Sequence, residues 1–105
     1  MRYLMQVRIP SEAGNRALRD PQFGERMAGL LADIKAEAAY FSTLDGQRGA
    51  YIVVQFDDAS AMPRLAEPFF LWLNADVTFL PVMRPEDLGA ATPSIRAAVQ
   101  QWGQT

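Results

Sequence analysis

The chain has 105 residues, of which 50% are hydrophobic and 21% charged, and this length suits one folded domain spanning residues 1–105. Ten basic residues against twelve acidic ones give a formal charge of −2, which makes nucleic acid an unsuitable partner. The chain has no histidine and no cysteine, so the usual zinc and haem ligands, thiol nucleophiles and disulfides are excluded, and we expect neither a metal site nor a cofactor.

The amino-terminal third predicts a strand, a loop and a helix. Residues 2–10 carry an apolar side chain at every odd position from Tyr3 to Ile9, a period typical of a strand. No apolar leader precedes this strand and no segment approaches the roughly 18 apolar residues of a membrane helix, so we expect a cytoplasmic protein without membrane contact. Residues 11–19 are polar, with Gly14 early among them, and predict a loop or a short irregular turn. Asp20-Pro21 then predicts the start of a helix that ends near Glu37.

The middle of the chain predicts a β-hairpin. Residues 38–44 and 50–56 are rich in strand-forming side chains, and the segment 45–49 between them contains Asp-Gly followed by a second glycine. Residues 51–54 are Tyr-Ile-Val-Val and leave almost no polar face, whereas a strand with one side in water alternates. The second strand of the hairpin is therefore expected in the centre of a sheet.

The last part of the chain predicts a helix, a strand and a helical tail. Asp57 and Asp58 offer capping oxygens for the helix, and Pro68 inside it should kink or divide it. Residues 76–84 predict the last strand, which belongs at a sheet edge because Pro81 cannot donate to a ladder. Two further proline-initiated helical turns predict a tail over residues 85–103.

This order of elements predicts an α+β, ferredoxin-like βαββαβ sheet with a C-terminal helical extension. Both helices of that fold cover one face of the sheet, yet here the strands carry apolar groups on both faces. We expect a second copy to cover the other face, giving a homodimer through the sheet face or the strand edges. The alternative cover is the C-terminal helix of the same chain.

Two carboxylates and a phenol are candidate catalytic groups. Glu67 precedes Pro-Phe-Phe, and a carboxylate among apolar side chains can exchange a proton near neutral pH. Glu37 is followed by Tyr40 where a helix gives way to a strand, which could place both at one cavity mouth. The structural alternatives are a salt bridge or cap for Glu67, a solvated helix end for Glu37 and an outward-facing ring for Tyr40.

Four residues are candidate ligand-binding groups. Arg8, Arg48 and Arg84 stand near strand ends or the hairpin, where the planar guanidinium suits a carboxylate ligand or an ion pair between subunits. Asn74 is expected to end the second helix, with a ligand contact as the alternative. An aromatic group around that helix could line a pocket or pack in the core: Phe69, Phe70, Trp72 and Phe79.

Two segments carry a family resemblance: EAAYFSTLDGQRGAYIVV (37–54) and AEPFFLWLNADVTFLPVMRPEDL (66–88), with a weaker extension through VRIPSEAGN (7–15). They resemble a family of small uncharacterised bacterial proteins with a dimeric α/β-barrel-type fold, a resemblance that implies no established activity or site residue. The architecture is also similar to that of muconolactone isomerases and cofactor-independent monooxygenases, an analogy at the level of the fold.

Two functional hypotheses follow from the sequence. The first is a homodimer that binds a small apolar or weakly acidic molecule in a cavity between sheet and helices. The second is a cofactor-independent isomerase or monooxygenase with Glu67 or Glu37 as general base, Tyr40 as hydrogen-bond donor and an arginine holding substrate charge. A purely structural partner subunit is a third possibility.

Overall fold

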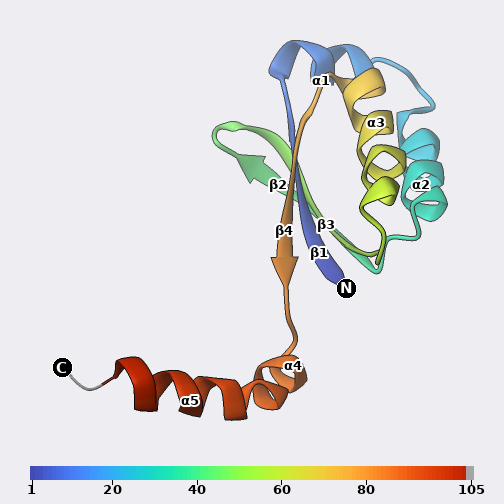
Figure 1. Ribbon diagram of the computed structural model, residues 1–105. Helices are drawn as coiled ribbons and strands as arrows, with labels where there is room; N and C mark the ends of the chain where they lie inside the picture. Colours follow the sequence, from blue (N-terminus) through green and yellow to red (C-terminus); the bar gives the residue numbers. More distant parts are fainter. Residues whose placement is uncertain (104–105) are drawn as a thin grey trace.

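The computed structural model describes residues 1–103, and its core is one four-stranded antiparallel sheet with helices on a single face (Figure 1). The strands lie in the order β2-β3-β1-β4. This is an α+β arrangement consistent with the expected ferredoxin-like fold. The elements in chain order are β1 (Arg2–Ile9), α1 (Ser11–Leu18), α2 (Phe23–Asp33), β2 (Ala38–Leu44), β3 (Gln47–Gln55), a 3-10 turn (Ala59–Ala61), α3 (Met62–Leu73), β4 (Asp76–Val82), α4 (Pro85–Ala90) and α5 (Thr92–Trp102).

The sheet order confirms two expectations from the sequence. The apolar strand β3 lies between β1 and β2, and β4 lies at an edge, where Pro81 is exposed. The β2–β3 connection is shorter than expected, because the ladder extends to the pair Leu44–Gln47. Asp45 and Gly46 have φ values of 53° and 78°, which is the two-residue turn that suits the twist of a hairpin.

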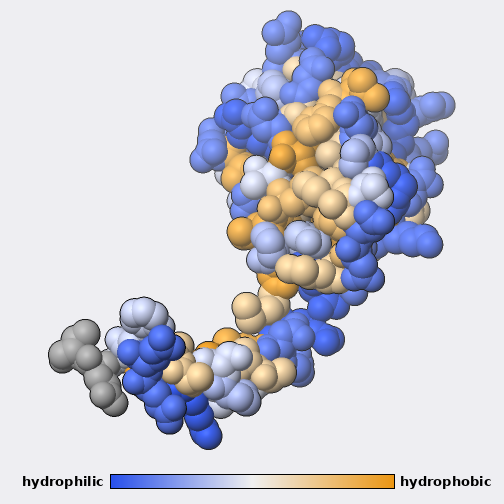
Figure 2. Space-filling view, in the orientation of Figure 1, coloured by the Kyte–Doolittle hydropathy of each residue, from blue (hydrophilic) through white to orange (hydrophobic). Residues whose placement is uncertain are grey.

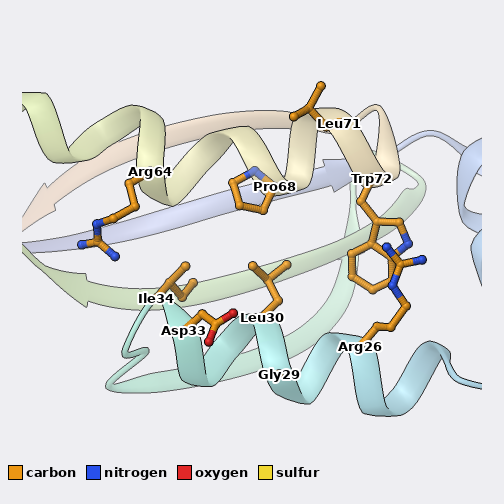
Figure 3. A pocket seen from close by; sticks show the side chains of 9 residues that line it. All are labelled: Arg26, Gly29, Leu30, Asp33, Ile34, Arg64, Pro68, Leu71 and Trp72. Atoms are coloured by element: carbon orange, nitrogen blue, oxygen red, sulfur yellow. The ribbon is translucent and has the colours of Figure 1, made fainter.

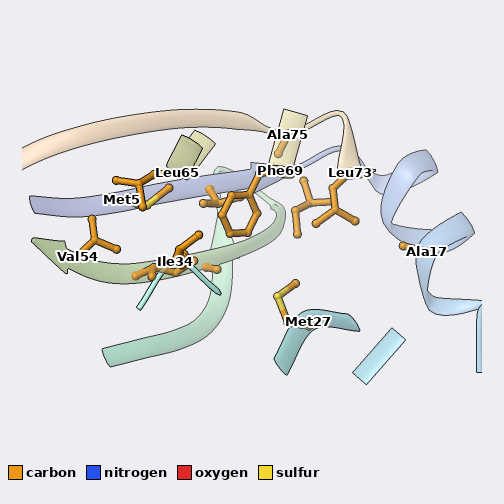
Figure 4. Packing of buried hydrophobic residues seen from close by; sticks show 13 residues of the cluster. Met5, Ala17, Met27, Ile34, Val54, Leu65, Phe69, Leu73 and Ala75 are labelled. Atoms are coloured by element: carbon orange, nitrogen blue, oxygen red, sulfur yellow. The ribbon is translucent and has the colours of Figure 1, made fainter. Parts of the chain in front are cut away.

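The hydrophobic core fills the layer between the sheet and the helices (Figure 4). Side chains from β1, β3 and α3 are fully buried there, and α2 adds Met27. The buried side chains of this layer form one cluster, and partly buried hydrophobic residues pack against it. The largest fully buried side chains are Phe69, Met5, Ile52, Leu65, Leu73, Val7 and Val54.

The expected loop over residues 11–19 is wrong, because Ser11–Leu18 forms helix α1. Gly14, which suggested a turn, is instead buried against the hairpin: a Cβ at this position would lie 2.7 Å from Nη1 of Arg48. The glycine therefore permits close packing. The following helix is also shorter than expected, since it begins at Phe23 and gives way at Lys35, whose φ is 55°.

Helix α3 is continuous although Pro68 lies inside it, so the expected division into two pieces does not occur. Asp58 accepts a hydrogen bond from the backbone N–H of Ser60 at 2.9 Å and caps the turn that leads into this helix. At the other end Asn74 adopts the left-handed conformation with φ of 51°, as expected for the residue that ends the helix.

Helices α4 and α5 form an arm that leaves the body of the molecule at the lower end of β4 (Figure 1). In this view α2 and α3 lie to the right of the sheet and the arm runs to the left. The radius of gyration is 17.8 Å and the longest axis measures 59 Å, whereas a compact chain of this length has a radius of gyration of about 13 Å. The alternative in which the C-terminal helix covers its own sheet is therefore wrong.

The arm carries an apolar stripe that its own chain leaves exposed. Figure 2 shows hydrophobic surface running from the body across the β4–α4 connection and onto the arm. The exposed apolar side chains of the arm are Leu88, Ile95, Val99 and Trp102. Within residues 1–103, none of the helices has the length and apolarity needed to span a bilayer.

Candidate functional site

We call the side of the sheet that faces away from α2 and α3 the open face. Strand alternation and the ladder registers define it, because the opposite side chains of β1 and β3 are buried in the core. Its residues are Arg2, Leu4, Gln6 and Arg8 of β1, Tyr51, Val53 and Gln55 of β3, Ala38 and Tyr40 of β2, and Thr78, Leu80 and Val82 of β4.

An ion pair borders the open face at one end. Arg2 donates from Nε and Nη2 to the two carboxylate oxygens of Glu37, at 2.9 and 2.7 Å, and Gln55 donates to the same carboxylate at 2.7 Å. The hydrogen bonds from Arg2, then those from Gln55, hold the pKa of the Glu37 carboxyl below its ordinary value, and the charge of Arg84 acts in the same direction. A carboxylate held in this way is a weak base, which favours a structural role for Glu37.

A second ion pair borders the other end. Arg8 donates to Oδ2 of Asp76 from Nε at 3.1 Å and from Nη2 at 2.5 Å. Arg8 and Asp76 are ladder partners on neighbouring strands, so their separation is set by the sheet. Between the two ion pairs lie one apolar row and one row of uncharged polar side chains, so the charged groups stand at the rim of the face.

Two rows of side chains cross the centre of the open face. One row is apolar and joins Leu80, Leu4, Val53 and Ala38. The next row carries hydroxyl and amide groups and joins Thr78, Gln6, Tyr51 and Tyr40. Leu80 is 46% exposed and Tyr40 is 67% exposed. The described chain therefore leaves apolar and hydrogen-bonding groups side by side on this surface.

Three of the predicted site residues share the open face or its border: Arg8, Tyr40 and Glu37. Tyr40 pairs with Tyr51 of β3, and Gln55, four residues further along β3, donates to Glu37. The carboxylate of Glu37 accepts its hydrogen bonds from Arg2 and Gln55.

The other predicted residues lie outside the open face, although the charge of Arg84 still acts on Glu37 at its border. Arg48 lies beside α1, against Gly14. Arg84 precedes α4, where its backbone N–H donates to Asp87 at 2.9 Å and its side chain lies 3.7 Å from Glu86. Asn74 is exposed at the end of α3. The structure therefore does not gather the seven predicted residues into one site.

Glu67 is exposed and lines a small groove of about 260 Å³ between α3 and the edge strand β4. The other lining side chains are apolar and include Phe70 and Phe79, so two of the four aromatic candidates lie here. No arginine lines this groove among the described residues. The expected pairing of Glu67 with an arginine in one cavity is thus not formed within residues 1–103.

A larger groove of about 840 Å³ lies between α2 and α3 (Figure 3). The sequence did not indicate this groove, because its residues come from the outward parts of two helices that only their packing brings together. The one available signal in the sequence was the helical spacing of these residues within each of the two segments, which places them on one side of each helix. The groove is lined by Arg26, Gly29, Leu30, Asp33, Ile34, Arg64, Pro68, Leu71 and Trp72.

Comparison with known protein families assigns the chain to one of them. A family model described as "Domain of unknown function (DUF3303)" matches residues 1–96. The protein belongs to this family. The DUF3303 match covers the whole sheet, α1 to α4 and the start of α5, so the open face, both grooves and the root of the arm lie within it. A search of curated proteins found no match to the chain.

Proposed function

We propose that the protein is a cytoplasmic homodimer of the dimeric α/β-barrel type that binds a small apolar or weakly acidic molecule. The observation that carries the dimer is the combination of an open sheet face crossed by an apolar row and an arm whose apolar stripe is exposed. Both surfaces belong to one chain, and the arm runs to the side of the sheet that the helices leave bare (Figure 1).

The open face supports self-association through its composition. Leu4, Val53 and Leu80 lie in one row across three strands, and water contact costs about 25 cal/mol for each Å² of such surface. A twofold symmetric contact would bury this row on both copies at once. The ion pairs at the two ends of the face would then form the polar rim of the contact.

The arm supports the same conclusion independently. Helix α5 has 11 residues, and isolated helices shorter than about 12–15 residues are marginal in water. Val99 is 60% exposed and Trp102 is 74% exposed. A helix of this length with an uncovered apolar stripe needs a surface to pack on. A second copy of the same chain can supply that surface, because it is present wherever the protein is.

The dimer is tested by light scattering over a concentration series, with one charge placed on each side of the sheet. Leu80→Asp alters the open face, and Leu18→Asp is the matched control because Leu18 is 49% exposed on α1, away from that face. We expect a dimer at micromolar concentration for the unaltered protein and the control, and a monomer for Leu80→Asp. A monomeric unaltered protein, or a dimer that tolerates Leu80→Asp, would contradict the proposal.

The alternative function is a cofactor-independent isomerase or monooxygenase that works between two open faces. It is supported by the row of Gln6, Tyr51 and Tyr40, whose amide and phenol groups could hold an anionic substrate in that space. The bonds of Glu37 to Arg2 disfavour it as general base. Native mass spectrometry of freshly purified protein distinguishes the hypotheses, because a bound molecule that leaves chemically unchanged after incubation supports binding.

A further inference from the structure

We propose that the groove between α2 and α3 is the ligand site, and that its ligand is a small amphipathic carboxylate with an extended apolar body. This rests on the binding half of the proposed function and is independent of the dimer, because the groove lies on the helix side of the sheet. Its volume of about 840 Å³ lies within the range of about 300–1,000 Å³ typical of small-molecule sites.

The walls of the groove suit an apolar body. Leu30 of α2 and Ile34, the residue that follows this helix, lie opposite Pro68 of α3 (Figure 3). Leu71, which is 80% exposed, also lines the groove, but its side chain points away from α2. Gly29 lines the groove as well, and a Cβ at this position would have no heavy atom within 4 Å. The missing side chain therefore leaves open space between the helices, in which an alkyl chain or ring can lie.

The charges of the groove suit an anion. Arg64 stands near one end and Arg26 near the other, and Asp33 is the one carboxylate among the lining residues (Figure 3). Arg26 is already engaged, since its guanidinium lies 4.7 Å from the Trp72 ring centre and 3.8 Å from Asp20. Among residues 1–103 no carboxylate lies within 4.0 Å of the Arg64 side chain, which leaves its guanidinium available to a ligand carboxylate.

The proline in α3 adds an acceptor on the same helix. Pro68 has no N–H, so it cannot donate to the carbonyl oxygen of Arg64 one turn earlier. The groove thus offers a cation near one end, an apolar middle, and the Trp72 ring near the other end.

The test titrates the protein with decanoate and follows the indole N–H signals of the two tryptophans by NMR. We expect the Trp72 signal to shift and the Trp102 signal, on the arm, to stay unchanged. Gly29→Leu should abolish the shift by filling the groove. Gly24→Leu is the matched control, because Gly24 lies on the same helix, also has nothing within 4 Å of a Cβ, and does not line the groove.

The charge requirement is tested with Arg64→Gln and with decanol as the uncharged analogue. We expect Arg64→Gln to weaken decanoate binding about tenfold and to leave decanol binding unchanged. Equal binding of decanoate by the Gly29→Leu and Gly24→Leu variants would overturn the site, and an unchanged affinity in Arg64→Gln would overturn the carboxylate. A co-purified molecule retained by Gly29→Leu would contradict the groove while leaving the proposed binding function intact.

Discussion

Arg2 of β1 and Glu37, one residue before β2, are joined by two hydrogen bonds across the end of β3, the strand that separates β1 from β2. Gln55, at the end of β3, donates to the same carboxylate. The three side chains therefore connect three strands that meet only pairwise in the backbone ladder. These hydrogen bonds hold the start of β2, which follows α2 in the chain, against the ends of β1 and β3.

The Arg2–Glu37 pair makes stability depend on pH in a defined direction. The pKa of Glu37 is lowered in the folded state, mainly by Arg2 and then by Gln55, from its ordinary value of 4.5. The stabilisation is therefore present above pH 4.5 and is lost as the pH falls through the lower folded value. We expect Glu37→Gln to lower the free energy of unfolding at pH 7 and to flatten its acid dependence in urea titrations.

The control for this experiment is Glu12→Gln. Glu12 also faces an arginine, Arg16 at 3.9 Å on the same helix, but its side chain is 92% exposed, and such surface pairs contribute little. If both substitutions change the acid dependence equally, the hydrogen-bonded arrangement around Glu37 has no special role.

Two glycine-to-alanine substitutions should change the free energy of unfolding in opposite directions. Gly49→Ala places a Cβ 2.7 Å from Cβ of Leu44 and 3.4 Å from the carbonyl oxygen of Val7, and overpacking of this kind costs about 1–3 kcal/mol. Gly29→Ala adds a methyl group in open space inside a helix, where it should stabilise by about 0.5–1 kcal/mol. Chemical denaturation of both variants measures the difference, and equal signs would contradict the packing described.

Adjacent phenylalanines on α3 should differ strongly in their contribution to stability. Phe69 is 0% exposed in the core and Phe70 is 38% exposed. We expect Phe69→Ala to cost about 3–5 kcal/mol, because it removes a buried ring and leaves a cavity. Phe70→Ala should cost a small fraction of that. Thermal and urea unfolding of the two variants are the measurement, and similar losses would show that the helix is rotated relative to the sheet.

The helix content of the arm should rise with protein concentration. Helix α5 lacks packing partners in the single described chain, so its helical state depends on the surface that covers it. Far-ultraviolet circular dichroism should strengthen across the concentration range in which light scattering reports assembly. Val99→Asp should weaken both changes together, and a helix content independent of concentration would separate the arm from assembly.

The order of strands was predictable from local signals that agree with one another. The Asp45-Gly46 turn fixed the hairpin, and Pro81 placed β4 at the edge, because each feature has one common structural solution. The helical conformation of residues 11–18 was not predicted, because a glycine such as Gly14 is equally compatible with a turn and with a helix that packs closely against a neighbour. Only the position of Arg48, 34 residues later in the chain, decides between them.

The candidate site was less predictable than the fold. The side-chain chemistry of Arg8, Glu37 and Tyr40 makes them site candidates, and the sheet register places them on or beside one face. The ionic partners of Arg8 and Glu37 come from strands distant in the sequence, which local patterns do not identify. The α2–α3 groove depends on the packing angle between two helices, and the direction of the arm depends on the backbone after Val82, so neither follows from side-chain periodicity.

The proline near the end of β4 limits how further strands can join this sheet. Pro81 has no N–H and lies on the outermost strand, so an incoming strand finds no donor at that position. A strand added along this edge would leave one of its own backbone carbonyl groups without a hydrogen-bond donor opposite Pro81. Pro81 therefore disfavours the addition of a further strand along the β4 edge of the sheet.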